Sequence, residues 1–301
     1  MRIFVTGASG HIGSAVIPEL LGAGHEVVGY ARSDDAAAVV AAAGATVQRG
    51  SLDDLDLIRA ASDSSDGVIH LAFRHDAMRA GDFIGAAETD RLAINAMIET
   101  LAGTSKPLAI SSGTLALAFL QLGRTAVETD VLEGGPRIDA ENAVIASAQR
   151  GVRSSVIRLT PTVHSSLDHH GFVPALVAIA REKGFAAYVG EGTNRWPAVH
   201  TLDAARLYRL AVEAAPAGTR LHAVGDEGVA FREIADAIGR NLNLPVVSIP
   251  AEEADAYFTY LSLFVQLDNP TSSEWTRELM GWTPTHAGVI ADLDEGHYFQ
   301  V

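Results

Sequence analysis

The chain has 301 residues, of which 48% are hydrophobic and 20% are charged, and its net charge is −15. This apolar content excludes an intrinsically disordered chain, and the negative charge disfavours nucleic acid and anionic membrane surfaces as partners. The absence of cysteine excludes a disulfide framework, a thiolate nucleophile and a cysteine zinc site. No basic leader precedes a long apolar stretch, and no apolar run reaches the roughly 20 residues of a membrane span. We therefore expect a soluble, cytoplasmic protein.

Short apolar runs alternate with helical patterns through the first half of the chain. Strands are predicted at residues 2–5, 26–30, 46–49, 67–71, 107–111 and 153–159, and helices at 14–21, 36–43, 53–61, 82–102 and 139–149. This alternation predicts βαβ units and an α/β fold, a doubly wound parallel sheet of the Rossmann type. The almost wholly apolar fourth and fifth strands fit burial on both faces of that sheet.

The alternation loosens after residue 160. Helices are predicted at 173–183, 203–214 and 231–242, with short strands at 221–224 and 246–249 between loops rich in Gly, Pro and His. We therefore predict a dinucleotide-binding core over residues 1–160. Residues 161–301 are expected to form mainly a small C-terminal substrate lobe, with segments that return to the core sheet.

A glycine-rich loop, Thr6-Gly7-Ala8-Ser9-Gly10-His11-Ile12-Gly13, joins the first strand to the first helix. Glycines at these positions permit a tight turn, let the backbone approach a pyrophosphate and allow close packing of helix on strand. The helix N-terminus adds amide donors and the positive end of a dipole. Because several βα units follow the loop, we favour a dinucleotide site over a glycine turn that binds nothing.

The end of the second strand distinguishes the two nicotinamide cofactors. An NAD site is expected to place an acidic residue there, to accept from the ribose 2′-hydroxyl. This chain instead has Arg32 and Ser33, which suit a 2′-phosphate. We therefore expect NADP(H) in preference to NAD(H), the alternative being that Arg32 is a solvated surface residue.

These features resemble the extended branch of the short-chain dehydrogenase/reductase family, whose members are similar to NAD-dependent epimerases and dehydratases. The glycine loop matches the Thr-Gly-x-x-Gly-x-x-Gly of that branch, and residues 68–72, 110–112, 196–206 and 278–284 resemble later family segments. The resemblance covers nearly the whole chain. It implies cofactor contacts, beyond Arg32 and Ser33, at Gly7, Ser9, Gly10, His11, Ile12, Gly13, Ser51, Leu52, Leu71, Ala72, Ser111, Thr160, Thr162 and Val163.

The chain departs from the family at the catalytic Tyr-x-x-x-Lys pair. No tyrosine occurs between Tyr30 and Tyr188, and Arg137 and Glu141 stand where family spacing places the pair. This pattern resembles the atypical members of the family, and it implies Ser112, Arg137 and Glu141 as the catalytic residues. Four residues apart on a helix, Arg137 and Glu141 are expected to form an ion pair. Arg137 would act as an electrostatic clamp, and Glu141 would orient Arg137 or accept from the nicotinamide ribose. The alternative is a surface salt bridge in an inactive site.

Four further residues are candidates for the substrate pocket: Thr114, His164, Trp196 and His200. A histidine with an ordinary pKa near neutrality could shuttle a proton, although His200 also fits a hydrogen-bonded residue at a strand end. Trp196 has packing in the core as its alternative. No metal site is predicted, because the histidines at 164, 169 and 170 lack a companion carboxylate at helical spacing.

The function favoured by the sequence is an NADP-dependent oxidoreductase that passes hydride between the nicotinamide and a small carbonyl or imine substrate. A redox-silent NADP-binding regulator is the alternative, and a nucleotide-sugar epimerase or dehydratase is the third. The family also implies a homodimer. Ser112 lacks the Gly-x-Ser-x-Gly turn of an α/β-hydrolase, which excludes that class.

Overall fold

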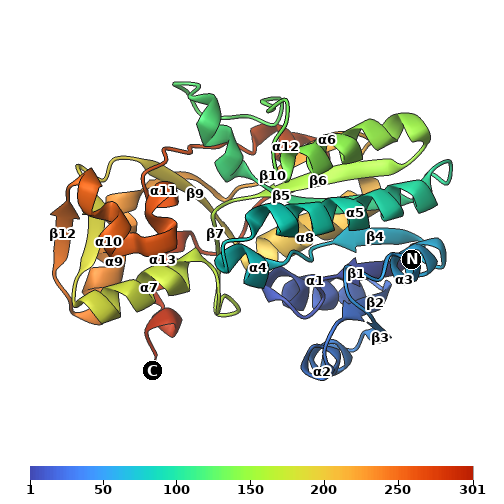
Figure 1. Cartoon of the computed structure of the whole chain (residues 1–301), viewed down its shortest axis with the longest axis horizontal. Helices are drawn as coiled ribbons and strands as arrows, with labels where there is room; N and C mark the ends of the chain where they lie inside the picture. The colour runs from blue at the N-terminus through green and yellow to red at the C-terminus, as the bar shows by residue number, and fades with distance from the viewer. Residues whose placement is uncertain (301) are drawn as a thin grey trace.

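A computed structural model describes residues 1–300, and a seven-stranded parallel sheet forms its centre (Figure 1). The strands are β1 (Arg2–Thr6), β2 (Glu26–Ala31), β3 (Thr46–Arg49), β4 (Gly67–His70), β5 (Pro107–Gly113), β6 (Arg153–Leu159) and β10 (Thr219–Ala223). Their order in the sheet is β3-β2-β1-β4-β5-β6-β10, with β1 paired in parallel to both β2 and β4. The strand order reverses between β1 and β4, which creates the crevice where such sheets bind ligands. The predicted doubly wound fold is confirmed.

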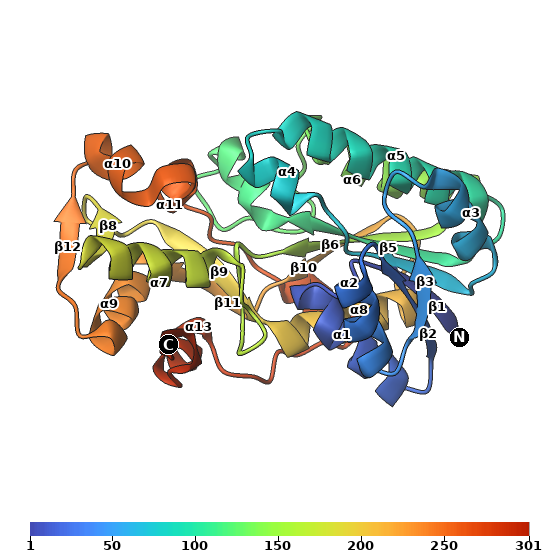
Figure 2. The same cartoon turned by 60° about the horizontal axis from the view of Figure 1, so that its bottom comes forward.

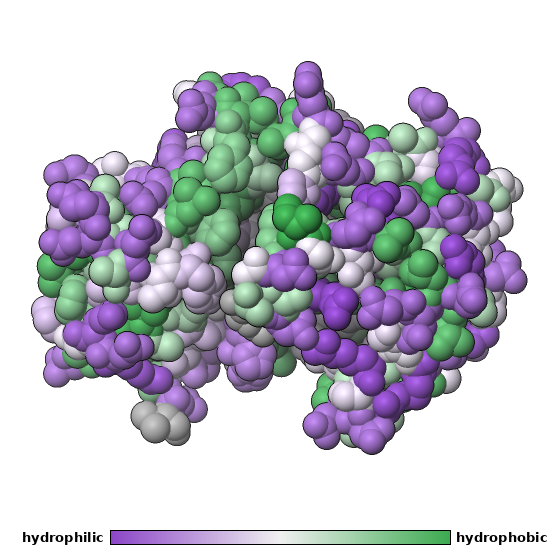
Figure 3. Space-filling view, viewed as in Figure 1, coloured by the Kyte–Doolittle hydropathy of each residue, from purple (hydrophilic) through white to green (hydrophobic). Residues whose placement is uncertain are grey.

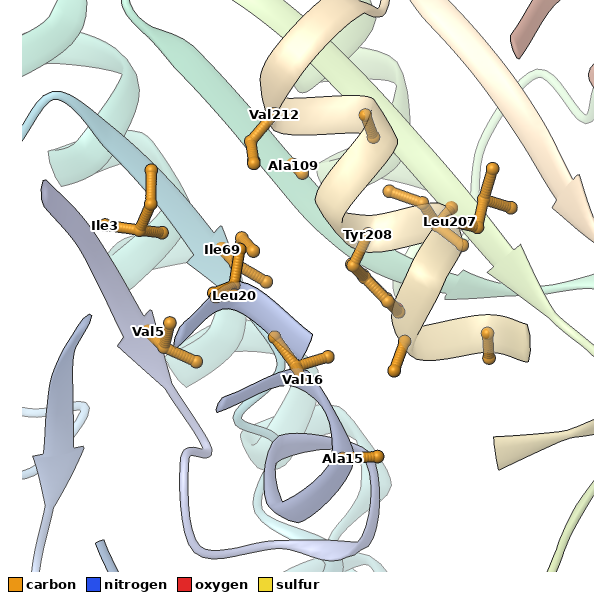
Figure 4. Close-up of a cluster of buried hydrophobic side chains, with 14 of the residues drawn as sticks. Ile3, Val5, Ala15, Val16, Leu20, Ile69, Ala109, Leu207, Tyr208 and Val212 are labelled. Atoms are coloured by element: carbon orange, nitrogen blue, oxygen red, sulfur yellow. The ribbon is translucent and has the colours of Figure 1, made fainter. Parts of the chain in front are cut away.

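Two layers of helices cover the sheet (Figure 2). One layer contains α1 (His11–Gly22), α2 (Asp34–Ala42) and α8 (Thr201–Ala214), and the other contains α3 (Leu55–Asp63), α5 (Phe83–Leu101) and α6 (Ile138–Ala146). Side chains of α1 and α8 pack on β1, β4 and β5, and Val16, Leu20 and Leu207 are fully buried there (Figure 4). The long helix α5 buries Ala86, Ala93 and Met97 at helical spacing.

The C-terminal lobe has its own apolar core and two small sheets. The order in the three-stranded sheet is β11-β9-β7, and β12 pairs in parallel with β8. The strands are β7 (Thr162–His164), β8 (Ala186–Val189), β9 (Arg195–His200), β11 (Asp226–Ala230) and β12 (Val246–Ile249). The helices are α7 (Phe172–Lys183), α9 (Phe231–Leu242), α10 (Ala254–Phe258), α11 (Ser262–Val265), α12 (Glu274–Met280) and α13 (Val289–Asp294). The chain returns to the main sheet through α8 and β10.

Short elements account for most differences from the sequence prediction. The strands β7, β8, β9 and β11 have only three to six residues, too few to show a clear period. The short helix α4 (His75–Arg79) was also not predicted. The helix predicted at 139–149 becomes 3₁₀ at Ser147–Arg150 and ends at Gly151, whose φ of 75° favours glycine.

Within residues 1–300, none of the helices is both long enough and apolar enough to cross a membrane.

Candidate cofactor and substrate site

The glycine loop after β1 is packed so closely that side chains would not fit. Gly7 has a φ of 66°, and a Cβ at this residue would lie 2.7 Å from the Ala72 amide nitrogen. A Cβ at Gly13 would overlap the Gly7 carbonyl oxygen and lie 2.6 Å from the Ala8 oxygen. Gly10 caps α1 without a side chain, and no acidic residue lies in the first turn. The first amides of α1 therefore remain available to an anion, and this cradle fits a dinucleotide pyrophosphate.

A buried hydrogen-bonded chain holds the other wall of this crevice. Thr6 Oγ1 lies 2.7 Å from His70 Nδ1, and His70 Nε2 lies 3.0 Å from Asp90 Oδ1 on α5. The Ala72 amide donates to Thr6 Oγ1 at 3.3 Å. These bonds fix the turn after β4 against Gly7. The positioning role of His70 was not predicted, although a histidine in an otherwise apolar strand was its signal.

Two arginines lie near the end of β2. Arg32 is exposed and pairs with Asp76 at 3.1 Å. Arg49 lies opposite Ala31 on β3, contacts the Arg32 carbonyl oxygen at 3.4 Å and pairs with Asp34. Arg49 was missed, because only the strand pairing brings it beside β2. The Ser33 hydroxyl accepts from the Ala36 amide and caps α2.

The remaining predicted cofactor contacts surround the carboxyl ends of the strands. Tyr30 donates to the Ser51 carbonyl oxygen at 2.9 Å, which holds the loop after β3 against β2. His11 Nε2 lies 2.7 Å from Thr201 Oγ1 at the start of α8. Burial and neighbouring histidines lower the pKa of His11 to about 4, so its ring is neutral at pH 7. Half-buried side chains among these contacts are Ser9, Ile12, Leu52, Leu71, Ala72 and Val163.

The pleat of β5 sends its two terminal serines to opposite faces of the sheet. Ser111 Oγ lies 2.7 Å from the Tyr208 hydroxyl of α8. Ser112 is buried on the α6 side, where its hydroxyl helps to lower the pKa of the Glu141 carboxyl. Ser111 is thus anchored by α8, and Ser112 belongs to the α6 side of the crevice.

The predicted ion pair between Arg137 and Glu141 does not form, and the structure corrects it. Arg137 precedes α6 with a φ of 67°, so the two residues do not share a helical face. The Glu141 carboxylate instead lies 2.6 Å from Arg158 Nη2 and 2.7 Å from Arg220 Nε.

The surroundings of Glu141 also exclude its predicted contact with a ribose, because only 1% of the residue is exposed. Burial alone would raise the pKa of Glu141, but hydrogen bonds and charge from Arg158, with Ser112 and Arg220, hold that pKa below its ordinary value. Glu141 is therefore an ionised, buried group that two arginines hold in place. Arg158 and Arg220 were missed, although an arginine between the apolar residues Ile157 and Leu159 of the buried strand β6 was a signal.

Arg137 lies across the carboxyl end of β5. Its Nη2 donates to the Ser111 carbonyl oxygen at 2.8 Å, and its guanidinium lies 4.2 Å from the centre of the Phe73 ring. Among residues 1–300, no carboxylate lies within ion-pairing distance of this guanidinium. A positive φ at a non-glycine residue is costly and concentrates at functional sites. The charge of Arg137 is thus available to a ligand.

The predicted pocket residues do not converge on one site. His164 and His200 line a cavity of about 140 Å³, together with His286 and Asp203, and the cavity is lined by none of the three proposed catalytic residues. His200 stacks on His286 with 4.5 Å between ring centres, and it accepts from the Leu202 amide as the cap of α8. Burial, with the neighbouring histidines, lowers the pKa of His200 to about 4, which removes it as a proton shuttle near neutral pH.

Other predicted residues have structural partners. Trp196 is fully buried in the C-terminal core and packs 5.0 Å from the Phe231 ring, which corrects its assignment to a pocket. His164 lies on a strand, fully buried, with Nδ1 2.9 Å from Asp292.

Three threonines complete the predicted set. The Thr160 hydroxyl donates to the Thr162 carbonyl oxygen at 2.9 Å. Thr162 Oγ1 is buried and has no hydrogen-bond partner within the described residues. Thr114 is buried and lies 3.1 Å from the Asn269 amide group.

The reversed strand order and the glycine cradle at its crevice define a dinucleotide-binding protein of the Rossmann type. Comparison with known proteins narrows this class. Residues 3–114 match the model of the NAD dependent epimerase/dehydratase family. An uncharacterized protein of Schizosaccharomyces pombe is 46% identical over 99% of this chain and 100% of its own length. The chain belongs to the NAD-dependent epimerase/dehydratase family, the extended short-chain dehydrogenases/reductases.

Two more distant proteins extend the comparison. The 2'-dehydrokanamycin reductase of Streptomyces kanamyceticus is 26% identical and aligns with 84% of this chain and 71% of its own. The structure of UDP-glucose 4-epimerase from Thermotoga maritima superposes with a TM-score of 0.79 at 19% identity, over 99% of this chain and 98% of that one. At this identity the superposition shows a shared fold.

Proposed function

We propose that this protein is an NADP(H)-dependent oxidoreductase that passes hydride between the nicotinamide and a carbonyl or imine carbon of a small substrate. The observation that carries this proposal is the guanidinium of Arg137, which lies beyond β5 without a carboxylate partner among the described residues. Distant similarity to a reductase in the same family supports it.

The cofactor would lie along the crevice at the carboxyl ends of β1 and β4. The amides of the glycine loop and of the first turn of α1 would bind its pyrophosphate, and Arg32 with Arg49 would bind a 2′-phosphate. When bound, NADPH supplies the hydride that the substrate carbon receives.

The chain itself would control the charge and the proton at the substrate oxygen. As hydride reaches the carbonyl carbon, the π electron pair moves to oxygen, and Arg137, which stays protonated, stabilises that negative charge. The Ser112 hydroxyl would donate to the ionised Glu141, and the Ser112 oxygen would accept a hydrogen bond from a water molecule. That water gives its other proton to the substrate oxygen, which completes the alcohol. Solvent replaces the proton that the water loses.

The cofactor assignment is tested by calorimetric titration of the protein with NADPH and NADH. We expect NADPH to bind more tightly, and Arg32→Ala to weaken NADPH by about tenfold while NADH changes little, since a charge-assisted hydrogen bond to phosphate is lost. Arg59→Ala removes an exposed, ion-paired arginine of α3 and is the matched control. Equal weakening of both nucleotides by Arg32→Ala would refute recognition of the 2′-phosphate.

A further inference from the structure

An apolar surface lines the hollow between the two lobes. Figure 3 shows hydrophobic atoms gathered over α11 and over the 3₁₀ helix η1 (Thr114–Leu120), beside a hollow that separates the lobes. Three large side chains of these segments are half exposed: Phe119 of η1 at 55%, Leu263 of α11 at 57% and Tyr260, just before α11, at 50%. Large apolar side chains exposed together mark a binding surface more often than chance exposure does.

This surface continues directly from the proposed catalytic residues. The helix η1 begins at the residue after β5 ends, and the Asn269 amide group ties its start to the segment that follows α11, 3.1 Å from Thr114. On the sheet side, the Arg137 guanidinium packs on the ring of Phe73. The centre of the Phe73 ring lies 6.4 Å from the centre of the Phe83 ring. An aromatic pair, Phe73 and Phe83, therefore borders Arg137 on this side.

The charge of the surface argues against a phosphorylated ligand. Residues 114–120 and 251–265 contain no lysine or arginine, and the second segment carries Glu252, Glu253 and Asp255. Diphosphates are bound through arginine, lysine or clustered backbone amides. A nucleoside diphosphate on this wall would meet apolar side chains and acidic residues instead.

We propose that the substrate is an uncharged carbonyl compound with an extended alkyl or aromatic group, and that this group binds along η1 and α11. The inference rests on the proposed oxidoreductase function, because it takes Arg137 as the group that receives the carbonyl oxygen. It adds the substrate class, an apolar molecule and not a nucleotide sugar.

The test measures binding of a homologous series of methyl n-alkyl ketones to the protein loaded with NADP⁺, which cannot reduce them, by ligand-observed NMR or calorimetry. Oxidation of NADPH by the same ketones is followed in parallel samples. Each methylene buried on the apolar wall should strengthen binding about fourfold, which corresponds to about 0.8 kcal/mol. Leu263→Ser and Phe119→Ser should each weaken the longest ketone by about tenfold. Leu57→Ser, which removes an exposed leucine from α3, is the matched control and should change nothing.

The outcomes separate the substrate class from the reaction. Binding that is independent of chain length, or that Leu57→Ser weakens as much as Leu263→Ser, would overturn the apolar class. Tighter binding of UDP-glucose than of any ketone would also overturn it. Self-association of the unliganded protein that Leu263→Ser abolishes, without an effect on ketone binding, would assign the surface to a second copy of the chain and overturn it. Chain-length-dependent binding without oxidation of NADPH would uphold the apolar class and reject the oxidoreductase function.

Discussion

The two ends of the cleft are built from different parts of the polypeptide. At the cofactor end the backbone forms the site: a glycine loop, the first turn of α1 and the turn after β4, packed to within 2.7 Å of where a side chain would begin. At the proposed substrate end side chains form it, with Ser112 buried on the side of Glu141 and the Arg137 guanidinium packed on the Phe73 ring. A site made of backbone tolerates almost no added atoms, whereas a site made of side chains can exchange its chemistry on the same fold.

The buried charges beneath the substrate end give the largest expected effect. Glu141→Gln keeps the shape but leaves Arg158, which is 1% exposed, without its anion. Removing one partner of a buried pair typically costs about 3–5 kcal/mol, and urea denaturation would measure it. Glu88→Gln breaks an exposed pair with Arg91 on α5 and should leave stability unchanged. Equal stability of Glu141→Gln and the wild type would mean that the Arg158 charge is compensated elsewhere.

Substitution of Arg137 tests the reaction proposed for the substrate end. Arg137→Ala should lower the turnover number by about 100-fold, as expected for loss of one preorganised group that stabilises a transition-state charge. NADPH affinity should stay within twofold, because the groups proposed to bind the pyrophosphate and the 2′-phosphate lie at the glycine loop, the first turn of α1 and the ends of β2 and β3. The comparison is made with steady-state kinetics and a parallel nucleotide titration. Unchanged turnover would mean that Arg137 only packs on Phe73 and takes no part in the reaction.

The cofactor end is tested by adding one methyl group. Gly13→Ala should force the backbone of the loop apart, because the added methyl group would overlap the Gly7 carbonyl oxygen. Overpacking of this kind costs about 1–3 kcal/mol, so we expect NADPH affinity to fall by about ten- to a hundredfold. Gly22→Ala adds the same group at the end of α1, where nothing lies within 4 Å, and should leave binding intact. A Gly13→Ala protein that binds NADPH as the wild type does would show that the loop is not a tight cradle.

The smallest expected effect concerns acid stability. The pKa of His200 falls from 6.5 to about 4 on folding, through burial and the nearby His164 and His286, against the opposing charges of Asp292 and Asp203. The unfolded chain therefore takes up a proton first, so the stability contributed above pH 6.5 is lost as the pH falls toward 4. His200→Asn retains an acceptor for capping α8 and should flatten this slope in melting-temperature profiles. Parallel profiles for the two proteins would show that His200 does not titrate on unfolding.

Burial raises the pKa of Asp168 to about 6, which acts in the opposite direction. Because folding favours the protonated acid of Asp168, the stability that this residue contributes is greatest at pH values below its ordinary pKa. That stability is lost as the pH rises through 6. Only the difference between His200→Asn and the wild type isolates the histidine.

The sequence was sufficient where the determining residues are neighbours in the chain. The glycine loop lies within eight residues, and its strand-turn-helix context could be predicted from the apolar run on one side and the helical pattern on the other. The parallel, doubly wound sheet followed from the alternation of strands and helices, whereas the order of its strands comes from the structure. In contrast, Glu141 meets Arg158 and Arg220, which lie 17 and 79 residues away, and His164 meets Asp292 across 128 residues. Such contacts leave no periodic signal in the sequence. The prediction therefore paired Glu141 with Arg137, the charge nearest in the chain, and not with the buried Arg158.

The central claim is most directly tested by following nicotinamide absorbance while NADPH and a panel of alkyl and aryl ketones, aldehydes and imines are added to the purified protein. The account predicts that NADPH binds and is oxidised by at least one member, with faster turnover for those that carry longer apolar groups. Tight NADPH binding without oxidation by any member would contradict it and favour a redox-silent regulator, and interconversion of nucleotide sugars would assign the protein to the epimerases.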